Sequence, residues 1–518
     1  MKRRAAFAIS TAALVSFWLV GAALGAPPKR PRPKPRPRIV DAGPPPEATA
    51  PADAGAPEAS AASATAPDVG GVPSSTEAAT DGGAPPPPAA TAEAPSSPPP
   101  AAPSPDEVAE PDKASFTIGG RIFGYARVPI ERPLTDPFQQ VSSSVWIEGK
   151  ATFNAATSAK LVLSADALTP SIEGTTELRG NIREAWASAH GHGLELRVGQ
   201  QIIAWGNADG INVLDLLSAT DFRFFTADAE VRKLGAFSTY FSWVPGESGP
   251  VEIDLVWTPV FPSSRLLFPL SLIPAGVTLA EPVHPKFALE NSEVGGKVTF
   301  TGSGWDIAAI GYYGYNHLPE FYLAKEDATG IVIGQTNYHY AAAGGEASLT
   351  AGKWVFRLEG SYIFTESNRG TIAFIQPSYV GGVLGIERPL GERFRVNAQG
   401  VVRYYPYFTD PVDKAGPDPA LQGIALANAI VQNYTDQLRP GATLRLAYTS
   451  EGESFEAEVF ALYYFIGRDY LVRPVIGYRF SDAFKLQLGA EYFGGSEDRS
   501  IGSLHPFSGV FTQASFFF

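Results

Sequence analysis

The feature that most constrains this chain is an alternation of apolar and polar residues that recurs throughout residues 114–518. The stretch 393–404 shows it best, because one face carries Phe394, Val396, Ala398, Gly400, Val402 and Tyr404. The other face carries Arg393, Arg395, Asn397, Gln399 and Arg403. Such a strand suits lipid on one side and water on the other, and its length of about ten residues is that of a tilted membrane strand. The pattern predicts an all-β fold, a transmembrane up-and-down antiparallel β-barrel over residues 114–518.

The connections between these segments give a strand count. Short turns are expected at 155–157, 190–193, 245–249, 302–304, 350–353, 389–392, 449–453 and 480–482. Longer connections alternate with them at 128–141, 168–176, 205–235, 260–292, 317–334, 366–373, 408–437 and 495–508, and only 466–469 breaks the pattern. Outer-membrane barrels pair short periplasmic turns with longer outer loops. We therefore predict about 18 strands, with about 16 as the alternative if the first or the shortest segment is a loop.

The first 113 residues differ sharply from the rest. Residues 1–25 have the order of a secretory signal peptide, in which Lys2, Arg3 and Arg4 precede an apolar stretch and then small residues. The chain has no cysteine, which excludes a lipoprotein anchor and disulfides. Residues 26–113 are mostly Pro, Ala, Ser, Thr and Gly, with too few apolar side chains to offset the entropy of ordering. We predict a disordered Pro/Ala-rich tether that stays in the periplasm.

The head of this tether, Lys29–Arg38, is a basic run spaced by prolines. Two interpretations stay open for it. It is either a solvated charge run or a segment attracted to an anionic surface such as the cell wall.

The last strand carries an expected targeting signal. Phe511, Phe516 and Phe518 resemble the C-terminal strand by which outer-membrane proteins are recognised, which ends in Phe with another aromatic residue two positions earlier. The resemblance implies the barrel assembly machinery and outer-membrane lipids as partners, and the bacterial outer membrane as location.

The polar faces of the strands predict the wall of the lumen. The inward-facing charges expected to line a pore are Arg357, Glu359, Arg393, Arg395, Arg403, Arg445, Glu456, Glu458 and Lys485. Neighbouring rows of opposite sign would set a field across a pore. Alternatively, these charges neutralise one another and stiffen the wall.

The connection 205–235 is too long for a hairpin and is rich in Val, Leu and Phe. Because a loop in water would expose this apolar surface, we expect it to fold into the barrel as a constriction. Asp209, Asp215, Asp221 and Arg223 would then face the remaining opening. The alternative is an outward cap on the neighbouring loop 260–292.

The sequence Asn207-Ala208-Asp209-Gly210 is interpreted as a tight turn rather than a calcium loop. Neither a metal nor a cofactor is expected.

One segment resembles a known family. A strand, Leu194-Glu195-Leu196-Arg197-Val198-Gly199-Gln200-Gln201, continues into Trp205-Gly206 and then a loop with Asp209-Gly210 and Asp215. This order is similar to the signature of a proteobacterial outer-membrane β-barrel family, domain of unknown function 1302. The resemblance covers about residues 190–260, includes Val256-Trp257-Thr258-Pro259, and has Gln200 where the family usually has Arg. It implies an outer-membrane barrel and envelope transport of small or apolar compounds.

These observations predict a function class. We expect a channel or porin-like transporter for small solutes, with no nucleic-acid partner. The alternative is a structural or binding barrel that is plugged by its loops and tethered to the cell wall. An outer-membrane enzyme ranks third, because the six histidines mostly fall in turns or loops and the common hydrolase and phosphate-binding motifs are missing from the sequence.

Overall fold

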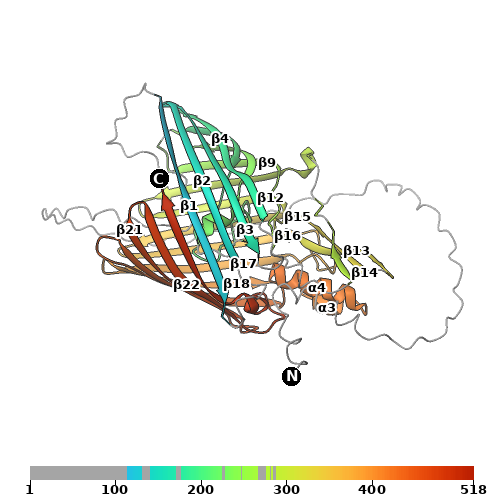
Figure 1. Ribbon diagram of the computed structural model, residues 1–518. Coiled ribbons are helices and arrows are strands. Elements are labelled where there is room, and N and C mark those ends of the chain that lie inside the picture. Colours follow the sequence, from blue (N-terminus) through green and yellow to red (C-terminus); the bar gives the residue numbers. More distant parts are fainter. Residues whose placement is uncertain are drawn as a thin grey trace, which may run out of the picture. The chain divides into compact units, whose positions relative to one another are not determined.

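A computed structural model describes residues 114–130, 140–170, 177–223, 228–246, 248–266, 276–280, 282–283, 287–328 and 330–518. The expected signal peptide (1–25) and tether (26–113) lie outside the described residues. Eighteen strands form one sheet (Figure 1). None of the described helices is long and apolar enough to cross a membrane.

The strands of this sheet follow one another around it in chain order. They are β1 (Ser115–Pro129), β2 (Gln140–Asn154), β3 (Thr157–Pro170), β4 (Glu177–Gly191), β5 (Leu194–Gln201), β8 (Ala236–Trp243), β9 (Val251–Val260), β11 (Glu293–Gly302), β12 (Trp305–Tyr315), β15 (His339–Ala351), β16 (Trp354–Thr365), β17 (Tyr379–Leu390), β18 (Phe394–Tyr404), β19 (Leu438–Thr449), β20 (Phe455–Tyr464), β21 (Tyr470–Ser481), β22 (Phe484–Gly494) and β23 (Gly509–Phe517). Each is antiparallel to the next.

The last strand closes the sheet on the first. β23 pairs antiparallel with β1, from Arg121 opposite Phe517 to Pro129 opposite Gly509. Phe518 extends this seam, because its main-chain N and O each hydrogen-bond to Gly120, at 3.0 and 2.9 Å. The molecule therefore contains a closed antiparallel barrel of 18 strands, which confirms the predicted fold class and the larger of the two strand counts.

Short and long connections alternate as expected. Two residues join β2 to β3, β11 to β12, β15 to β16 and β21 to β22, whereas the opposite end carries connections such as 202–235, 261–292 and 405–437. The exception is 465–469, which joins β20 to β21 at the end of the long loops. We call the two ends of the barrel the short-turn end and the long-loop end.

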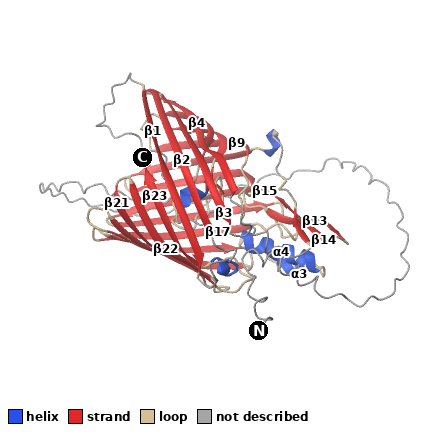
Figure 2. Cartoon of the chain, in the orientation of Figure 1, coloured by secondary structure: helices blue, strands red, loops and turns tan. Residues whose placement is uncertain are grey.

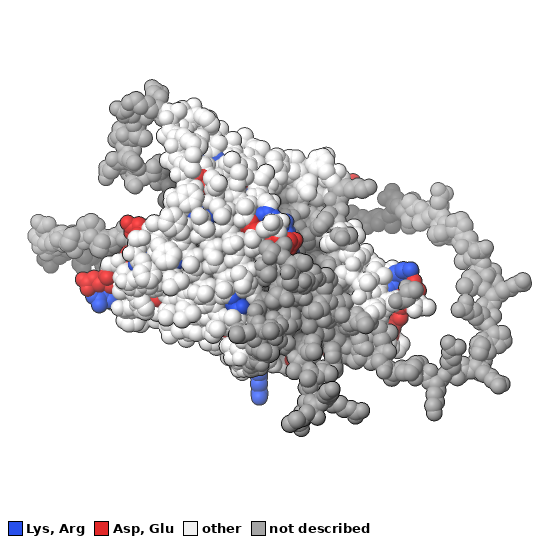
Figure 3. Space-filling view, in the orientation of Figure 1, with Lys and Arg blue, Asp and Glu red and all other residues white. Residues whose placement is uncertain are grey.

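The outward face of the barrel is that of a lipid-facing wall. Its mid-strand side chains are exposed and apolar, among them Leu255, Ile307, Leu358, Leu384, Leu444 and Leu488. Exposed aromatic side chains mark the short-turn end at Phe116, Trp243, Trp305, Trp354, Phe394 and Phe484. A second set marks the long-loop end at Phe237, Trp257, Tyr313, Phe364, Tyr404 and Tyr463. Charged atoms are sparse over the part of this wall that Figure 3 shows. An apolar band between two aromatic girdles is the surface of a membrane-spanning barrel.

The long loops hold further elements (Figure 2). β13 (Glu320–Asp327) and β14 (Gly330–Thr336) form a hairpin, and β10 (Val277–Leu279) adds to it parallel to β14. The connection 405–437 contains α3 (Pro411–Lys414) and α4 (Pro419–Gln432). The remaining short elements are β6 (Ala219–Thr220), α2 (Ala229–Arg232), β7 (Lys233–Leu234), η2 (Leu289–Asn291) and η3 (Gly502–Phe507).

Helix α4 packs on the hairpin through an apolar cluster and one polar side chain. Ile424 and Ala427 of α4 share a buried cluster with Phe321 and Ile333. The amide of Asn428 accepts from Phe321 N at 2.7 Å and donates to Phe321 O at 2.9 Å. These contacts fix the helix against the strands of the neighbouring loop at the long-loop end.

Candidate functional site

The connection 202–235 between β5 and β8, here called the crossing loop, reaches the opposite wall of the barrel. Counted around the sheet, β5 is the fifth strand and β19 the fourteenth, so they are nine positions apart in a barrel of 18. Asp209 Oδ2 on the loop lies 2.8 Å from Arg445 Nε on β19. Because nine is half of 18, this ion pair joins opposite sides of the lumen.

The inner segment of the crossing loop, residues 205–217, shares an apolar core with the wall. Its buried side chains are Trp205, Val213, Leu214, Leu216 and Leu217. They lie in one cluster with inward-facing residues of eight strands, namely Tyr240, Val256, Ile310, Tyr312, Ala342, Ile363, Val383, Val401, Phe460, Leu462 and Tyr464. Burial of one large apolar side chain stabilises a fold by about 1.5–3 kcal/mol. The inner segment therefore lies inside the barrel, where we expected it.

Two glycines make room for these contacts. At Gly295 on β11, a Cβ would come within 2.6 Å of the Trp205 ring. Gly210 has φ +84°, and a Cβ there would lie 2.8 Å from the Phe460 ring. The Asp209-Gly210 pair thus forms a tight turn that brings Asp209 to Arg445, and Arg445 Nη1 also binds Glu458 Oε1 at 2.6 Å.

Glu359 on β16 holds the start of the inner segment. Its Oε1 accepts hydrogen bonds from the backbone N of Asn207 and of Ala208, each at 2.6 Å, and its Oε2 accepts from Val213 N at 3.1 Å. Glu359 is 1% exposed. A carboxylate that accepts several N–H groups makes strong charge-assisted bonds. We expected Glu359 to line a pore, and the structure instead uses it to anchor the loop.

The return segment of the crossing loop, residues 228–234, lies against the wall of β1 to β4. Arg183 on β4 donates to the main-chain O of Glu230, Val231 and Lys233 at 2.7, 3.2 and 3.0 Å. Arg121 on β1 binds Asp228 at 2.8 Å, and both arginines lie over the Trp146 ring. The crossing loop is therefore fixed at both walls.

A third part of the crossing loop is bound to the next loop rather than to the wall. Arg265 N donates to Thr220 O at 3.0 Å, and Phe222 N donates to Arg265 O at 2.9 Å. Residues 205–217 thus lie inside the barrel, while 220–222 packs on the loop that follows β9.

The four charges expected to face an opening are all in ion pairs. Asp209 binds Arg445, and Asp215 lies 3.7 Å from Lys233. Asp221 is 2% exposed and binds Arg223 and Arg265, so it does not face an opening. Burial, opposed by the nearby Arg265 and Arg179, raises the pKa of Asp221 to about 6.

The inward charges nearer the short-turn end form pairs that water still reaches. On neighbouring strands, Arg357 Nη1 lies 2.6 Å from Glu387 Oε2 and Arg395 Nε lies 3.6 Å from Glu387 Oε1. Lys485 Nζ lies 2.6 Å from Glu456 Oε1. These pairs fit the second interpretation of the lumen charges, in which neighbours neutralise one another.

Two of the expected pore-lining arginines lie elsewhere. Arg393 is in the turn before β18, half-exposed, and binds Glu451 across the short-turn end at 2.5 Å. Alternation places a side chain only within a strand, and β18 begins at Phe394. Arg403 lies at the long-loop end of β18, and its Nη1 donates to Gln432 O of α4 at 3.1 Å.

The expected targeting residues take different faces of the seam strand. Phe516 and Phe518 are exposed, on the side of lipid, whereas Phe511 is buried and stacks on Tyr125 at 5.5 Å between ring centroids. Phe511 therefore belongs to the inner packing of the seam.

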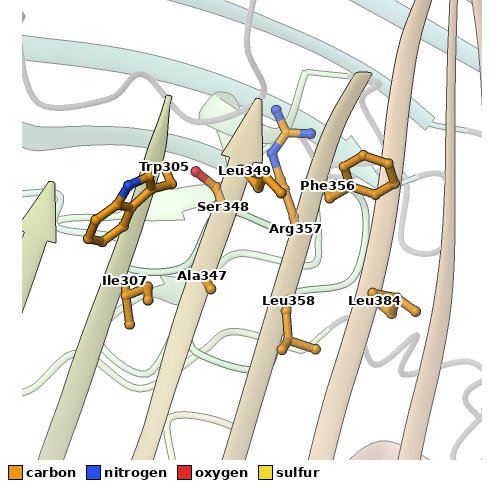
Figure 4. A pocket seen from close by; sticks show the side chains of 9 residues that line it. All are labelled: Trp305, Ile307, Ala347, Ser348, Leu349, Phe356, Arg357, Leu358 and Leu384. Carbon is orange, nitrogen blue, oxygen red and sulfur yellow. The ribbon is translucent and has the colours of Figure 1, made fainter. Parts of the chain in front are cut away.

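A hollow on the outer wall lies apart from this site. Figure 4 shows the residues around it, from β12, β15, β16 and β17. Ile307, Leu349, Leu358 and Leu384 are exposed on the lipid side, and Ala347 between them is small. The hollow faces the lipid and is separate from the lumen.

The residues that anchor the crossing loop cannot be recognised from the sequence next to them. Glu359 lies about 150 residues from the amides it binds, and its place in the alternating pattern is that of any other inward-facing residue.

Helix α4, in contrast, has start and stop signals in its own sequence. Asp418 caps its first turn, Pro419 is its first residue, and Asn433 ends it with φ +57°. The expected loop 408–437 contains this helix.

Comparisons with known proteins add fold relatives only. No protein-family model matches the sequence, and no curated protein matches it, so the resemblance of residues 190–260 to the family of unknown function stays a prediction. Among solved structures, the chain is similar to OccK5 (OpdH) of Pseudomonas aeruginosa, with 10% identity, 78% of this chain and 97% of that chain covered, and a TM-score of 0.45.

Two further solved structures are similar at the same level. OccAB3 of Acinetobacter baumannii has 9% identity, 78% and 99% coverage and a TM-score of 0.44. OmpF of Salmonella typhi, in a complex with daunomycin, has 10% identity, 78% and 97% coverage and a TM-score of 0.39. At these values the function of this chain has to be argued from its own residues.

Proposed function

We propose that the chain is a passive outer-membrane channel for small solutes, narrowed by the crossing loop. The observation that carries the proposal is the Asp209–Arg445 ion pair, which joins a loop rooted at β5 to the opposite wall. A loop fixed at both walls divides the lumen and limits the size of what passes.

Solvent access to the inward charges supports a water-filled lumen toward the short-turn end. The side chains of Arg395 and Glu456 are 37% and 32% exposed although they face inward. The apolar band between aromatic girdles supports an outer-membrane location. The tether in the periplasm remains part of the proposal. These features favour a channel over a barrel filled by side chains along its whole length.

The alternative is a plugged barrel whose tether binds the cell wall through Lys29–Arg38. It is favoured by the contact of Arg403 with α4, which draws the connection 405–437 over the long-loop end.

Liposome swelling separates the two functions. The folded barrel is reconstituted into liposomes and exposed to uncharged sugars of increasing size, with empty liposomes as the control. A channel admits small sugars quickly and larger ones slowly or not at all. Swelling no faster than in empty liposomes, with the barrel shown to be folded by heat-modifiability, would favour the plugged barrel.

A further inference from the structure

A second group of charges faces the lumen where the barrel closes. Tyr125 and Arg127 lie on β1, Glu491 on β22 and Arg473 on β21, and Arg232 approaches from α2 of the return segment. The charges that act on the Tyr125 hydroxyl are those of Arg127, Glu491, Arg473 and Arg232. We call these five residues the seam cluster.

The seam cluster holds three guanidinium groups and one carboxylate. Glu491 lies 3.8 Å from Arg127 Nη2 and 3.6 Å from Arg473 Nη1, which is longer than a hydrogen bond. The side chains of these three residues are 7%, 1% and 13% exposed, respectively. Arg232 forms no ion pair with a described carboxylate and its Nε is shielded from water, so its positive charge is costly without a counter-charge.

A nearby carboxylate does not supply that counter-charge. Asp228 also acts on Arg232, but it binds Arg121 at 2.8 Å and caps α2. Burial, and next the positive charge of Arg473, lower the pKa of Arg232.

Several polar atoms of the seam cluster have no hydrogen-bond partner among the described residues. They are Tyr125 Oη, Arg232 Nε, Arg473 Nε and Glu491 Oε2. Tyr125 is 2% exposed, so water does not freely satisfy its hydroxyl. A buried donor left without an acceptor costs about 1–3 kcal/mol. Three of these atoms are donors, or can act as one, and together they suit an acceptor from outside the chain.

We propose that the seam cluster binds a small oxyanion, the carboxylate or phosphate group of a solute in the lumen. The inference rests on the proposed channel, because the solute would reach the cluster through the lumen. Guanidinium groups present planar pairs of N–H donors that match the oxygens of carboxylate and phosphate. The guanidinium groups of Arg232 and Arg473 suit the oxygens of one such anion, with the Tyr125 hydroxyl as a further donor.

The position of the cluster also fits a solute moving past the crossing loop. Arg232 belongs to the return segment, whereas Arg127 and Arg473 belong to the wall. An anion bound here would touch both the loop and the wall. It would therefore sit beside the narrowed part of the lumen, where weak binding favours passage of anions.

Binding of inorganic phosphate to the full chain in lipid-free detergent micelles tests the proposal. Calorimetry at constant ionic strength, with chloride as the competing anion, measures the affinity, and acetate tests the carboxylate. Arg232→Gln is the main variant, since Arg232 lies on the loop and outside the barrel strands. Because a charge-assisted contact is lost, we expect phosphate affinity to fall at least about tenfold.

Two more variants make the result specific. Arg473→Gln should weaken phosphate binding similarly, and heat-modifiability shows whether that barrel is folded. Lys233→Gln is the matched control, because it removes one positive charge from the next residue, which is paired with Asp215. Phosphate affinity should be unchanged in it.

The outcomes separate this inference from the channel itself. Wild-type protein that binds neither phosphate nor acetate, or binding that is equal in wild type, Arg232→Gln and Lys233→Gln, would overturn the anion site. Binding that appears only after phospholipid is added would assign the site to a lipid headgroup and overturn a solute site. A barrel that swells liposomes but binds no anion disproves only the anion site, whereas one that binds phosphate and admits no sugar disproves only the channel.

Discussion

Glu359 holds the inner segment of the crossing loop by its backbone. It accepts three backbone hydrogen bonds from the loop while almost fully buried. In Glu359→Gln the amide group can accept at only one of its two ends, so at least one loop N–H loses its partner. We expect docking of the loop to weaken by about 1–3 kcal/mol. Hydrogen exchange of the peptide that contains residues 205–217 measures this.

The matched control for that variant is Glu387→Gln. Glu387 also faces inward, on the neighbouring strand, but its partners are Arg357 and Arg395 of the wall. Equal protection of the loop in the two variants would mean that Glu359 does not hold it.

Asp221 makes the docking of the crossing loop depend on pH. Its pKa is about 6 in the folded chain against an ordinary value of 3.8. Between these values the docked loop binds a proton that the undocked loop does not. Docking should therefore strengthen as the pH falls through about 6 and weaken as it rises, by about 3 kcal/mol at most.

Hydrogen exchange of residues 205–223, corrected for the intrinsic rate, tests this at about pH 5 and about pH 7.5. Protection should be greater at the lower pH, and Asp221→Asn should remove the difference. Stronger protection at the higher pH would show that the ion pairs with Arg223 and Arg265 outweigh burial.

Among the elements, the seam between β1 and β23 is the one that closes the barrel. Phe518 adds two backbone hydrogen bonds to it and places its ring on the lipid side. Deletion of Phe518 should reduce insertion into the outer membrane while export across the inner membrane continues. Phe518→Leu keeps the backbone pairing and separates it from the effect of the aromatic ring.

The readout is the amount of heat-modifiable barrel in the outer-membrane fraction. An undiminished amount in the deletion variant would argue against a role of the last residue in assembly.

The strands could be predicted and the contacts between loops could not, for physical reasons. Alternation has a period of two and repeats over a whole strand, so β18 or β22 can be read from its own residues. Phe394 to Tyr404 are placed as the pattern predicts, whereas Arg393 falls one residue before the strand. Contacts such as Asp209–Arg445 join residues 236 apart and depend on how the barrel closes. Helix α4 is an exception among the loops, because Asp418-Pro419 and Asn433 are start and stop signals within its own sequence.

At the scale of the whole molecule, packing on two opposite walls holds the crossing loop inside the barrel. The inner segment buries Trp205, Leu214 and Leu217 against one wall, and the return segment lies under Arg183 and Arg121 of the other. Ions that cross the barrel must pass beside these contacts. We therefore expect this loop to limit conduction.

Single-channel conductance in a planar bilayer shows whether the crossing loop limits conduction. Gln201 and Ala236 are opposite each other in the pairing of β5 with β8, so a short Gly-Ser turn can replace residues 203–234 without altering the strands. We predict that this variant, shown to be folded by heat-modifiability, conducts several-fold more current per channel than the wild type. Equal conductance in the two folded barrels would show that the crossing loop does not limit conduction.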